Sequence, residues 1–259
     1  MATVEEKLAR SLSSEGVDII PYLPYLLQDL WELGSSPRDM LEMVKRHLKI
    51  SSGIKVLDLA CGKGAVSILL AKELGCRIKG IDIVPEFIAY AEQKALAWGV
   101  DKLCTFSTGD ITQSVHTETG YDLVILGAVG DVLGNPEETI VLLKKTLKKG
   151  GYILIDDAYG NDPGNEDYYN RTQWLRFMEN AGVELVDEKP IEKEEITAIN
   201  QEQQAHIIKR ARELKEQRPE NAQLFDRYIQ SQQSECDELE NEITGVTLLL
   251  RTRDDNCTK

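Results

Sequence analysis

The stretch KVLDLACGKGAVSILL, residues 55–70, decides the fold of this chain. It begins with an apolar run at residues 56–59, continues through a turn that contains Gly62 and Gly64, and then places apolar residues at helical spacing. This pattern predicts a strand, a tight glycine turn and a helix. Glycine lets the backbone bend sharply, and a ligand can then lie against bare main chain at the helix N-terminus. We therefore expect a binding site at this turn.

Two acidic residues near the turn indicate the kind of ligand. Asp58 lies inside the first predicted strand, and Asp82 ends the apolar segment that predicts the second. In an open parallel sheet the carboxyl ends of the strands face the ligand crevice, where an acid suits the two hydroxyls of a ribose. Asp58 would repel a pyrophosphate and attract an ammonium group. Together the two acids predict a nucleoside that carries an amino acid.

The heptapeptide DLACGKG, residues 58–64, resembles the first motif of class I S-adenosylmethionine-dependent methyltransferases. In that family an acid is followed by small residues at alternate positions, usually glycines, and Ala60 stands here in place of the first glycine. The resemblance covers residues 36 to 190 and a last strand at 245–251. It implies S-adenosyl-L-methionine as the cofactor and methyl transfer as the activity, and it says little about the substrate.

The resemblance also implies a role for individual residues. Gly62 and Gly64 would approach the methionine part of the cofactor. Asp82 would hold the ribose hydroxyls, Ile83 would lie against the adenine, and Asp110 would accept a hydrogen bond from the adenine amino group. The full set of predicted cofactor residues is Asp58, Ala60, Cys61, Gly62, Gly64, Asp82, Ile83, Asp110, Ile111, Gly127 and Ala128.

Strand and helix signals alternate after the glycine turn. Apolar strand segments occur at residues 77–81, 104–108, 122–126, 152–155 and 183–186, with helical segments at 65–74, 85–98, 136–147 and 172–180. Several strands are apolar without alternation, as expected where helices cover both faces of a sheet. The predicted fold class is α/β: a doubly wound, mainly parallel seven-stranded sheet with helices on both faces and an antiparallel last strand.

Segments outside this alternation predict two additions. Residues 1–35 form an N-terminal helical cap, with helices at 3–13 and Pro21–Leu33, and residues 36–191 with 243–252 form the methyltransferase domain. Residues 192–242 read as an inserted pair of amphipathic helices, divided near Pro219. We expect the cap and the insertion to act as a lid over the crevice. A homodimer contact is the alternative role of the insertion.

The charge of the chain restricts its partners. With 30 Lys and Arg against 44 Asp and Glu, the formal net charge is -14, and the basic residues form only small clusters. Such a chain repels a long phosphate backbone. We therefore expect a small-molecule substrate, and neither a nucleic acid nor a membrane as a partner.

Cysteine usage and hydropathy indicate the compartment. The five cysteines, at positions 61, 76, 104, 236 and 257, show no metal-ligand spacing, and their odd number fits reduced thiols. Cys61 in the glycine turn is expected to be a small apolar filler rather than a reactive thiol. Residues 1–10 lack the apolar core of a signal peptide, and no apolar run approaches the length of a membrane span. A cytoplasmic location is predicted.

Catalysis by this class would need few side chains, because the positive sulfur already activates the methyl group. Alignment of nucleophile, methyl carbon and sulfur can supply on the order of 7 to 11 kcal/mol. Asp156 and Asp157 follow the fifth strand, and one of them is the candidate that orients or deprotonates the acceptor; a capping or hydrogen-bonding role is the alternative. The predicted substrate contacts are Tyr22, Trp31, Asp131, Tyr159 and Trp174.

A metal-dependent mechanism is disfavoured. Asp131, Asp156 and Asp157 could supply the oxygen ligands of a magnesium ion. Metal-dependent catechol-type methyltransferases, however, have an acid where this chain has Gly127, and an Asp-Asn pair where it has residues 156–157. No metal is predicted.

Other classes of function remain open. A glycine turn with an acid about twenty residues later is also the fingerprint of nicotinamide oxidoreductases. Asp58 inside the strand, Ser67 where the third glycine or alanine is expected, and Asp110 all argue against that class. A methyltransferase acting on a protein side chain and a non-catalytic protein that binds S-adenosylmethionine are the further alternatives.

Overall fold

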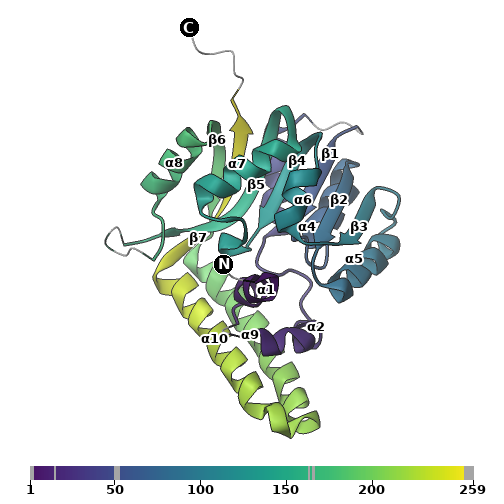
Figure 1. Ribbon diagram of the computed structural model, residues 1–259, viewed down its shortest axis with the longest axis vertical. Coiled ribbons are helices and arrows are strands. Elements are labelled where there is room, and N and C mark those ends of the chain that lie inside the picture. Colours follow the sequence, from purple (N-terminus) through teal and green to yellow (C-terminus); the bar gives the residue numbers. More distant parts are fainter. Residues whose placement is uncertain (1–2, 15, 50–52, 163, 165–166, 254–259) are drawn as a thin grey trace. The chain divides into compact units, whose positions relative to one another are not determined.

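The structure is a computed structural model that divides into two compact units (Figure 1). Unit 1 contains Met1–Trp31, Ala158–Tyr168 and Pro190–Gly245, and unit 2 contains Glu32–Asp157, Tyr169–Lys189 and Val246–Lys259. The structure describes residues 3–14, 16–49, 53–162, 164 and 167–253.

Seven strands form one sheet in the order β3-β2-β1-β4-β5-β7-β6. They are β1 Lys55–Leu59, β2 Arg77–Asp82, β3 Cys104–Thr108, β4 Tyr121–Gly127, β5 Leu147–Gly160, β6 Val183–Pro190 and β7 Ile243–Thr252. The pairs β1–β2, β2–β3, β1–β4 and β4–β5 are parallel, and the last strands are antiparallel. The predicted doubly wound sheet is confirmed.

Two groups of helices accompany the sheet in unit 2. The helices are α3 Pro37–His47, α4 Ala65–Leu74, α5 Pro85–Ala97, α6 Ile111–Thr117, α7 Pro136–Thr146 and α8 Arg171–Asn180, with a 3-10 turn, η2, at Gly130–Leu133. α4 packs against α3 and α5, whereas α7 packs against α6 and α8. Right-handed crossovers place successive helices of such a sheet on opposite faces when the strand order reverses, which happens here between β1 and β4.

Unit 1 is helical and has its own core. It contains α1 Val4–Ser11, η1 Val17–Tyr22, α2 Leu23–Leu26, α9 Lys193–Gln217, η3 Pro219–Asn221 and α10 Ala222–Asn241. The ring of Tyr22 meets the fully buried Phe225 edge to face, with centroids 5.0 Å apart. Arg210 of α9 donates two hydrogen bonds to Asp29, of 2.6 and 2.7 Å. Apolar packing and this paired contact fix the first residues of the chain to α9 and α10.

The predicted helix Pro21–Leu33 is wrong. The structure has a 3-10 turn ending at Tyr22 and a single α-helical turn ending at Leu26. Pro24 lacks an amide proton and stands in the first turn of α2, which separates α2 from η1. After Leu26 the backbone continues in turns, in which the amides of Gln28 and Leu30 donate to the carbonyls three residues before them. The leucines that suggested helical spacing are buried all the same; they are Leu23, Leu26, Leu27 and Leu30. The spacing of these leucines reflects their burial in the core of unit 1 and does not indicate a long helix.

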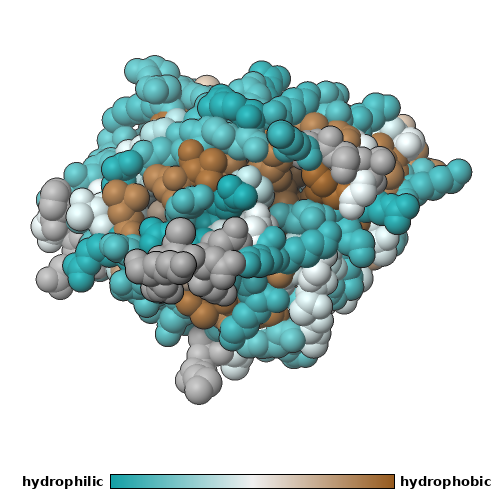
Figure 2. Space-filling view, turned by 90° about the horizontal axis from the view of Figure 1, so that it is seen from above, coloured by the Kyte–Doolittle hydropathy of each residue, from teal (hydrophilic) through white to brown (hydrophobic). Residues whose placement is uncertain are grey.

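Hydrophilic residues cover most of the face shown in Figure 2, with smaller hydrophobic areas between them. Among the described residues, the helices are too short or too polar to cross a lipid bilayer. The cysteines at 61, 76, 104 and 236 are free thiols, as predicted, and Cys257 lies outside the described residues.

Phe106 of β3 fixes the glycine turn against its neighbours. A methyl group on Gly80 would lie 2.6 Å from the Phe106 ring and 2.9 Å from the sulfur of Cys61. A methyl group on Gly64 would lie 2.9 Å from the Cβ of Ala91 and 3.0 Å from the same ring. The ring therefore fills the space that these two glycines leave, and Gly64 serves close packing between the turn, β3 and α5.

We predict that Gly80→Ala lowers the free energy of unfolding by about 1–3 kcal/mol, because the new methyl group overpacks the contact with Phe106. Urea unfolding measures this change. Gly16→Ala is the matched control, since a methyl group there would meet nothing within 4 Å and its φ of -145° is accessible to alanine. Equal stability of both variants would contradict the packing role of Gly80.

Candidate active site

The candidate site lies at the carboxyl ends of β1 and β4. These strands are neighbours in the sheet, and the strand order reverses between them. The glycine turn follows β1, and Gly127 and Ala128 stand at the end of β4. Reversal points of this kind form the ligand crevice in open α/β sheets. The structure thus brings the two predicted glycine-rich segments to the same edge.

Three alternate residues of the turn have left-handed backbone conformations. Their φ angles are 57° at Ala60, 53° at Gly62 and 74° at Gly64. An L-residue with a side chain adopts this conformation at a cost of about 1–2 kcal/mol, whereas glycine adopts it freely. This geometry explains the alternation of small residues in the motif, with Ala60 as the strained member.

Asp82 joins β2 to the glycine turn. Its side chain is buried, and its carboxylate accepts hydrogen bonds from the backbone amides of Gly62 at 2.8 Å and Val84 at 2.9 Å. Burial raises the pKa of Asp82. Each carboxylate oxygen can accept a further hydrogen bond, so the two hydroxyls of a ribose remain acceptable partners.

Asp58 is the second buried acid of the site. Its carboxylate accepts a hydrogen bond of 2.6 Å from the hydroxyl of Ser67 in α4, and only 3% of the residue is exposed. Burial, together with the nearby charge of Asp82, raises the pKa of Asp58 to about 7. A cation placed beside these two acids would favour their ionised forms. The electrostatics therefore suit an ammonium group, as predicted from the sequence.

The sequence reasoning missed the roles of Ser67 and Lys63. In the sequence, Ser67 indicated only a departure from the dinucleotide fingerprint. In the structure, its hydroxyl lies in the first turn of α4 and donates a hydrogen bond to Asp58 of β1. Lys63 is buried, and its ammonium lies 5.0 Å from the ring centre of Tyr90 and 5.6 Å from that of Phe87. These cation–π contacts fix the glycine turn to α5. A lysine between two glycines, with aromatic residues on the following helix, could have indicated this contact.

Cys61 has the environment expected of a filler. Its sulfur lies beside the position that a Cβ on Gly80 would occupy. Burial raises the pKa of this thiol well above its ordinary value, and the neighbouring Asp58 adds to the effect. The thiolate form needed for nucleophilic reactivity is therefore disfavoured.

The predicted adenine residues lie after β2 and β3. Asp110 is the N-cap of α6 and accepts hydrogen bonds of 2.8 Å from the amide and hydroxyl of Thr112. Ile111 is buried, and Ile83 directly follows Asp82. Asp110 is half-buried at this cap. The contacts of these residues with an adenine stay a prediction.

The two candidate catalytic acids differ in their surroundings. The prediction that both acids follow the fifth strand is wrong, because β5 continues to Gly160. Asp156 is buried within β5, opposite the last residue of β4, and accepts hydrogen bonds from the amide of Ser36 at 3.3 Å and from the hydroxyl of Thr247. Burial raises the pKa of Asp156 to about 6. Asp157 is half-buried. No group of three or more His, Cys, Asp or Glu side chains suited to a metal ion occurs among the described residues.

The predicted substrate residues are divided between the two units. Asp131 is exposed in η2 of unit 2, and Trp174 is buried on α8 of the same unit. Tyr22, Trp31 and Tyr159 belong to unit 1. Their contacts with a substrate stay predictions.

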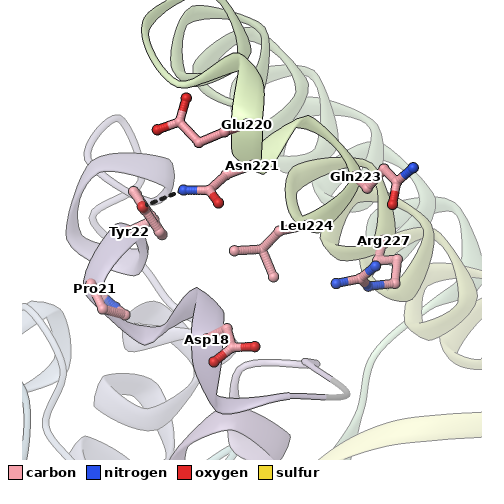
Figure 3. Close-up of a pocket in the computed structure, with 8 residues that line it drawn as sticks. All are labelled: Asp18, Pro21, Tyr22, Glu220, Asn221, Gln223, Leu224 and Arg227. Atoms are coloured by element: carbon pink, nitrogen blue, oxygen red, sulfur yellow. Dashed lines mark hydrogen bonds between the residues drawn. The ribbon is translucent and has the colours of Figure 1, made fainter.

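A polar cavity in unit 1 contains one of these residues (Figure 3). Its volume is about 410 Å³, and it is lined by Asp18, Pro21, Tyr22, Glu220, Asn221, Gln223, Leu224 and Arg227. The hydroxyl of Tyr22 accepts a hydrogen bond of 2.8 Å from the side-chain amide of Asn221. In Figure 3, Leu224 points into the hollow between the carboxylate of Asp18 and the guanidinium of Arg227. The sequence reasoning did not predict this cavity, because residues about 200 positions apart form it.

The order of the strands and the glycine turn beside Asp58 and Asp82 define a Rossmann-like fold of the class I methyltransferase type. A family model described as a methyltransferase domain matches residues 50–233, so the chain belongs to this family. Solved structures agree on the fold. A SAM-dependent methyltransferase from Geobacter sulfurreducens, in complex with S-adenosyl-L-homocysteine, has a TM-score of 0.75 and 22% identity, covering 90% of this chain and 98% of that one.

Curated relatives match only part of their length. Ribosomal protein L11 methyltransferase of Campylobacter concisus is 33% identical over 123 residues, which are 46% of this chain and 40% of the relative. Ajmaline N-methyltransferase of Rauvolfia serpentina is 29% identical over 127 residues, which are 49% of this chain and 44% of the relative. The chain thus spans less than half the length of each of these two relatives.

We predict that Asp58→Asn weakens the pH dependence of stability. The unfolded chain releases this proton near pH 3.8, whereas the folded chain keeps it up to about pH 7. The free energy of unfolding of the natural protein therefore decreases as the pH rises through this window. The variant lacks this contribution, which is on the order of 4 kcal/mol above pH 7, although Asp82 and Asp156 leave a residual slope.

Urea unfolding at a series of pH values from 4 to 8 measures this effect. Asp101→Asn, which removes an exposed acid of the same unit, should keep the slope of the natural protein. A slope in Asp58→Asn equal to that of the control would contradict the assignment of a buried, protonated Asp58.

Proposed function

We propose that this protein is an S-adenosylmethionine-dependent methyltransferase that acts on a small molecule. The observation that carries the proposal is the pair of buried acids, Asp58 and Asp82, around the turn at Gly62, at the point where the strand order reverses. Family membership and the fold of neighbours crystallised with S-adenosyl-L-homocysteine support the same cofactor.

The contacts of the two acids fit different parts of the cofactor. Asp58 lies in the sheet and accepts a hydrogen bond from Ser67 of α4. Its carboxylate offers a negative charge to the ammonium of the methionine part. Asp82, fixed by the amides of Gly62 and Val84, offers its remaining acceptor positions to the ribose hydroxyls. Between them the left-handed backbone of Gly62 lets the ligand approach the main chain.

The reaction is an in-line displacement. A lone pair of the acceptor forms a bond to the methyl carbon while the bond from that carbon to sulfur breaks, and its electron pair neutralises the sulfur. The protein contributes alignment and exclusion of water. Where the acceptor carries a proton, that proton must leave. We propose Asp157 as the base, because its side chain is half-buried, whereas Asp156 is buried.

A small-molecule acceptor agrees with the charge of the chain. The formal charge of -14 disfavours RNA and DNA. A protein side chain is the second candidate acceptor, because one relative is named for methylation of ribosomal protein L11. A non-catalytic protein that binds the cofactor would show the same acids and the same turn, so product formation decides between binding and turnover.

We predict that the protein binds S-adenosyl-L-homocysteine and that Asp82→Ala weakens this binding by at least tenfold. The variant loses charge-assisted hydrogen bonds to the ribose, each worth about 1.5–3 kcal/mol, and frees the amide of Gly62. Isothermal titration calorimetry measures the affinity, with NAD as the competing ligand class. Asp122→Asn at the other end of β4 is the control, because its carboxylate contacts Lys148 and not the glycine turn. Binding of NAD in place of S-adenosyl-L-homocysteine would refute the proposal.

We predict that Asp157→Asn lowers kcat on the true acceptor by about 10²–10⁴-fold while cofactor affinity stays unchanged, because general-base catalysis contributes that much. A panel of amine, phenol, thiol and carboxylate acceptors, followed by product mass, identifies the acceptor first. Unchanged kcat in Asp157→Asn would remove the base role from this residue.

A further inference from the structure

Four consecutive residues, 33–36, lie against the turn after β1, the end of β4 and Asp156 of β5. Leu33 approaches the turn after β1, since its Cδ1 would lie 3.4 Å from a Cβ on Gly62. Gly34 meets Ala128 and Ser35 meets Gly127 at the end of β4. A Cβ on Gly34 would lie 2.6 Å from that of Ala128, and a Cβ on Gly127 would lie 2.0 Å from the hydroxyl of Ser35.

The last residue of this segment is fixed by Asp156 of β5. The amide of Ser36 donates to Oδ2 of Asp156, and the side chain of Ser35 is a further hydrogen-bond partner of the same carboxylate. The other oxygen, Oδ1, accepts from the hydroxyl of Thr247 on β7, of which 1% is exposed. Asp156 pairs with Gly127 across β4 and β5, so its carboxylate lies next to the strand end that the segment crosses.

We propose that residues 33–36 form a wall of the cofactor site at its methionine end, and that Asp156, itself oriented by Thr247, positions this wall. We call residues 33–36 the strap. The proposal rests on the proposed function, because Gly62, Gly127 and Ala128 border the methionine part of the cofactor only in that reading. Asp156 is in this view a positioning residue that acts through the strap.

The local sequence supports a fixed strap. Gly34 has a φ of 90°, which disfavours any side chain, and a Cβ there would also clash with Ala128. Ser36 is the N-cap of α3 and accepts a hydrogen bond from the amide of Asp39. The start of α3 therefore fixes the last residue of the strap, and the buried carboxylate of Asp156 fixes Ser35 and Ser36.

Two substitutions test the positioning role from opposite sides. Asp156→Asn replaces one acceptor oxygen with a donor group, and Thr247→Val removes the orienting hydroxyl while it keeps the shape of the buried side chain. We expect each variant to bind S-adenosyl-L-homocysteine about 10- to 100-fold more weakly, as for the loss of a hydrogen bond to a charged group. In the Asp156→Asn background, Thr247→Val should have little further effect, because both act through the same carboxylate.

Hydrogen exchange gives a readout that is independent of turnover. The amide of Ser36 should exchange faster in both variants, because its acceptor is weakened or misplaced. Asp187→Asn is the matched control. The carboxylate of Asp187 accepts hydrogen bonds from Arg46 and His47 at the other end of α3, so this variant loosens the helix without touching the strap. Its cofactor affinity should equal that of the natural protein.

The outcomes separate the proposal from its rivals. Unchanged affinity in both variants, with the natural protein binding S-adenosyl-L-homocysteine, would overturn the positioning role alone. Absence of binding by the natural protein would instead refute the proposed function. Loss of turnover in Asp156→Asn with unchanged affinity, and full activity of Thr247→Val, would show that Asp156 is the catalytic base and overturn the proposal. If Asp156→Asn does not fold, Thr247→Val carries the test.

Discussion

The carboxylate of Asp82 holds together the two turns on which the site depends. It accepts one amide hydrogen bond from Gly62 after β1 and another from Val84 after β2, and it is buried between them. Two backbone donors compensate for the loss of water around the charge, although burial still raises its pKa. Without this contact the glycine turn would have to find other acceptors, so the shape of the turn and the position of the acid are a single feature.

The buried carboxyl of Asp58 destabilises the protein when it is ionised and no cation is bound. Its carboxyl lies within the sheet close to Asp82, and burial raises its pKa to about 7. The ionised form that an ammonium group needs is therefore destabilised until a cation arrives. An ionised buried acid that destabilises the protein alone and is stabilised by a bound ligand indicates a functional site.

Much of unit 2 could be predicted because its information is local. Strand β1, the glycine turn and helix α4 follow one another within twenty residues, and the acids at 58 and 82 belong to adjacent strands. The apolar segments alternate with helices whose N-termini are capped, by Ser36 in α3 and by Asn135 in α7. Prediction failed where apolar periodicity had two explanations, as in Pro21–Leu33, where leucines that are buried from a short helix and turns have the spacing of a helix face.

The rest of the site depends on contacts that connect distant positions. Asp156 lies 120 residues from Ser36 and 91 from Thr247, and no spacing rule joins the three. The sequence predicted that both acids follow the fifth strand, whereas β5 contains them, and it could not show that Asp156 is engaged by these two residues. The glycine turn and the acid before it form a continuous motif that can be recognised in the sequence. The contacts of Asp156 with Ser36 and Thr247 arise only when the fold brings together residues that are far apart in the sequence.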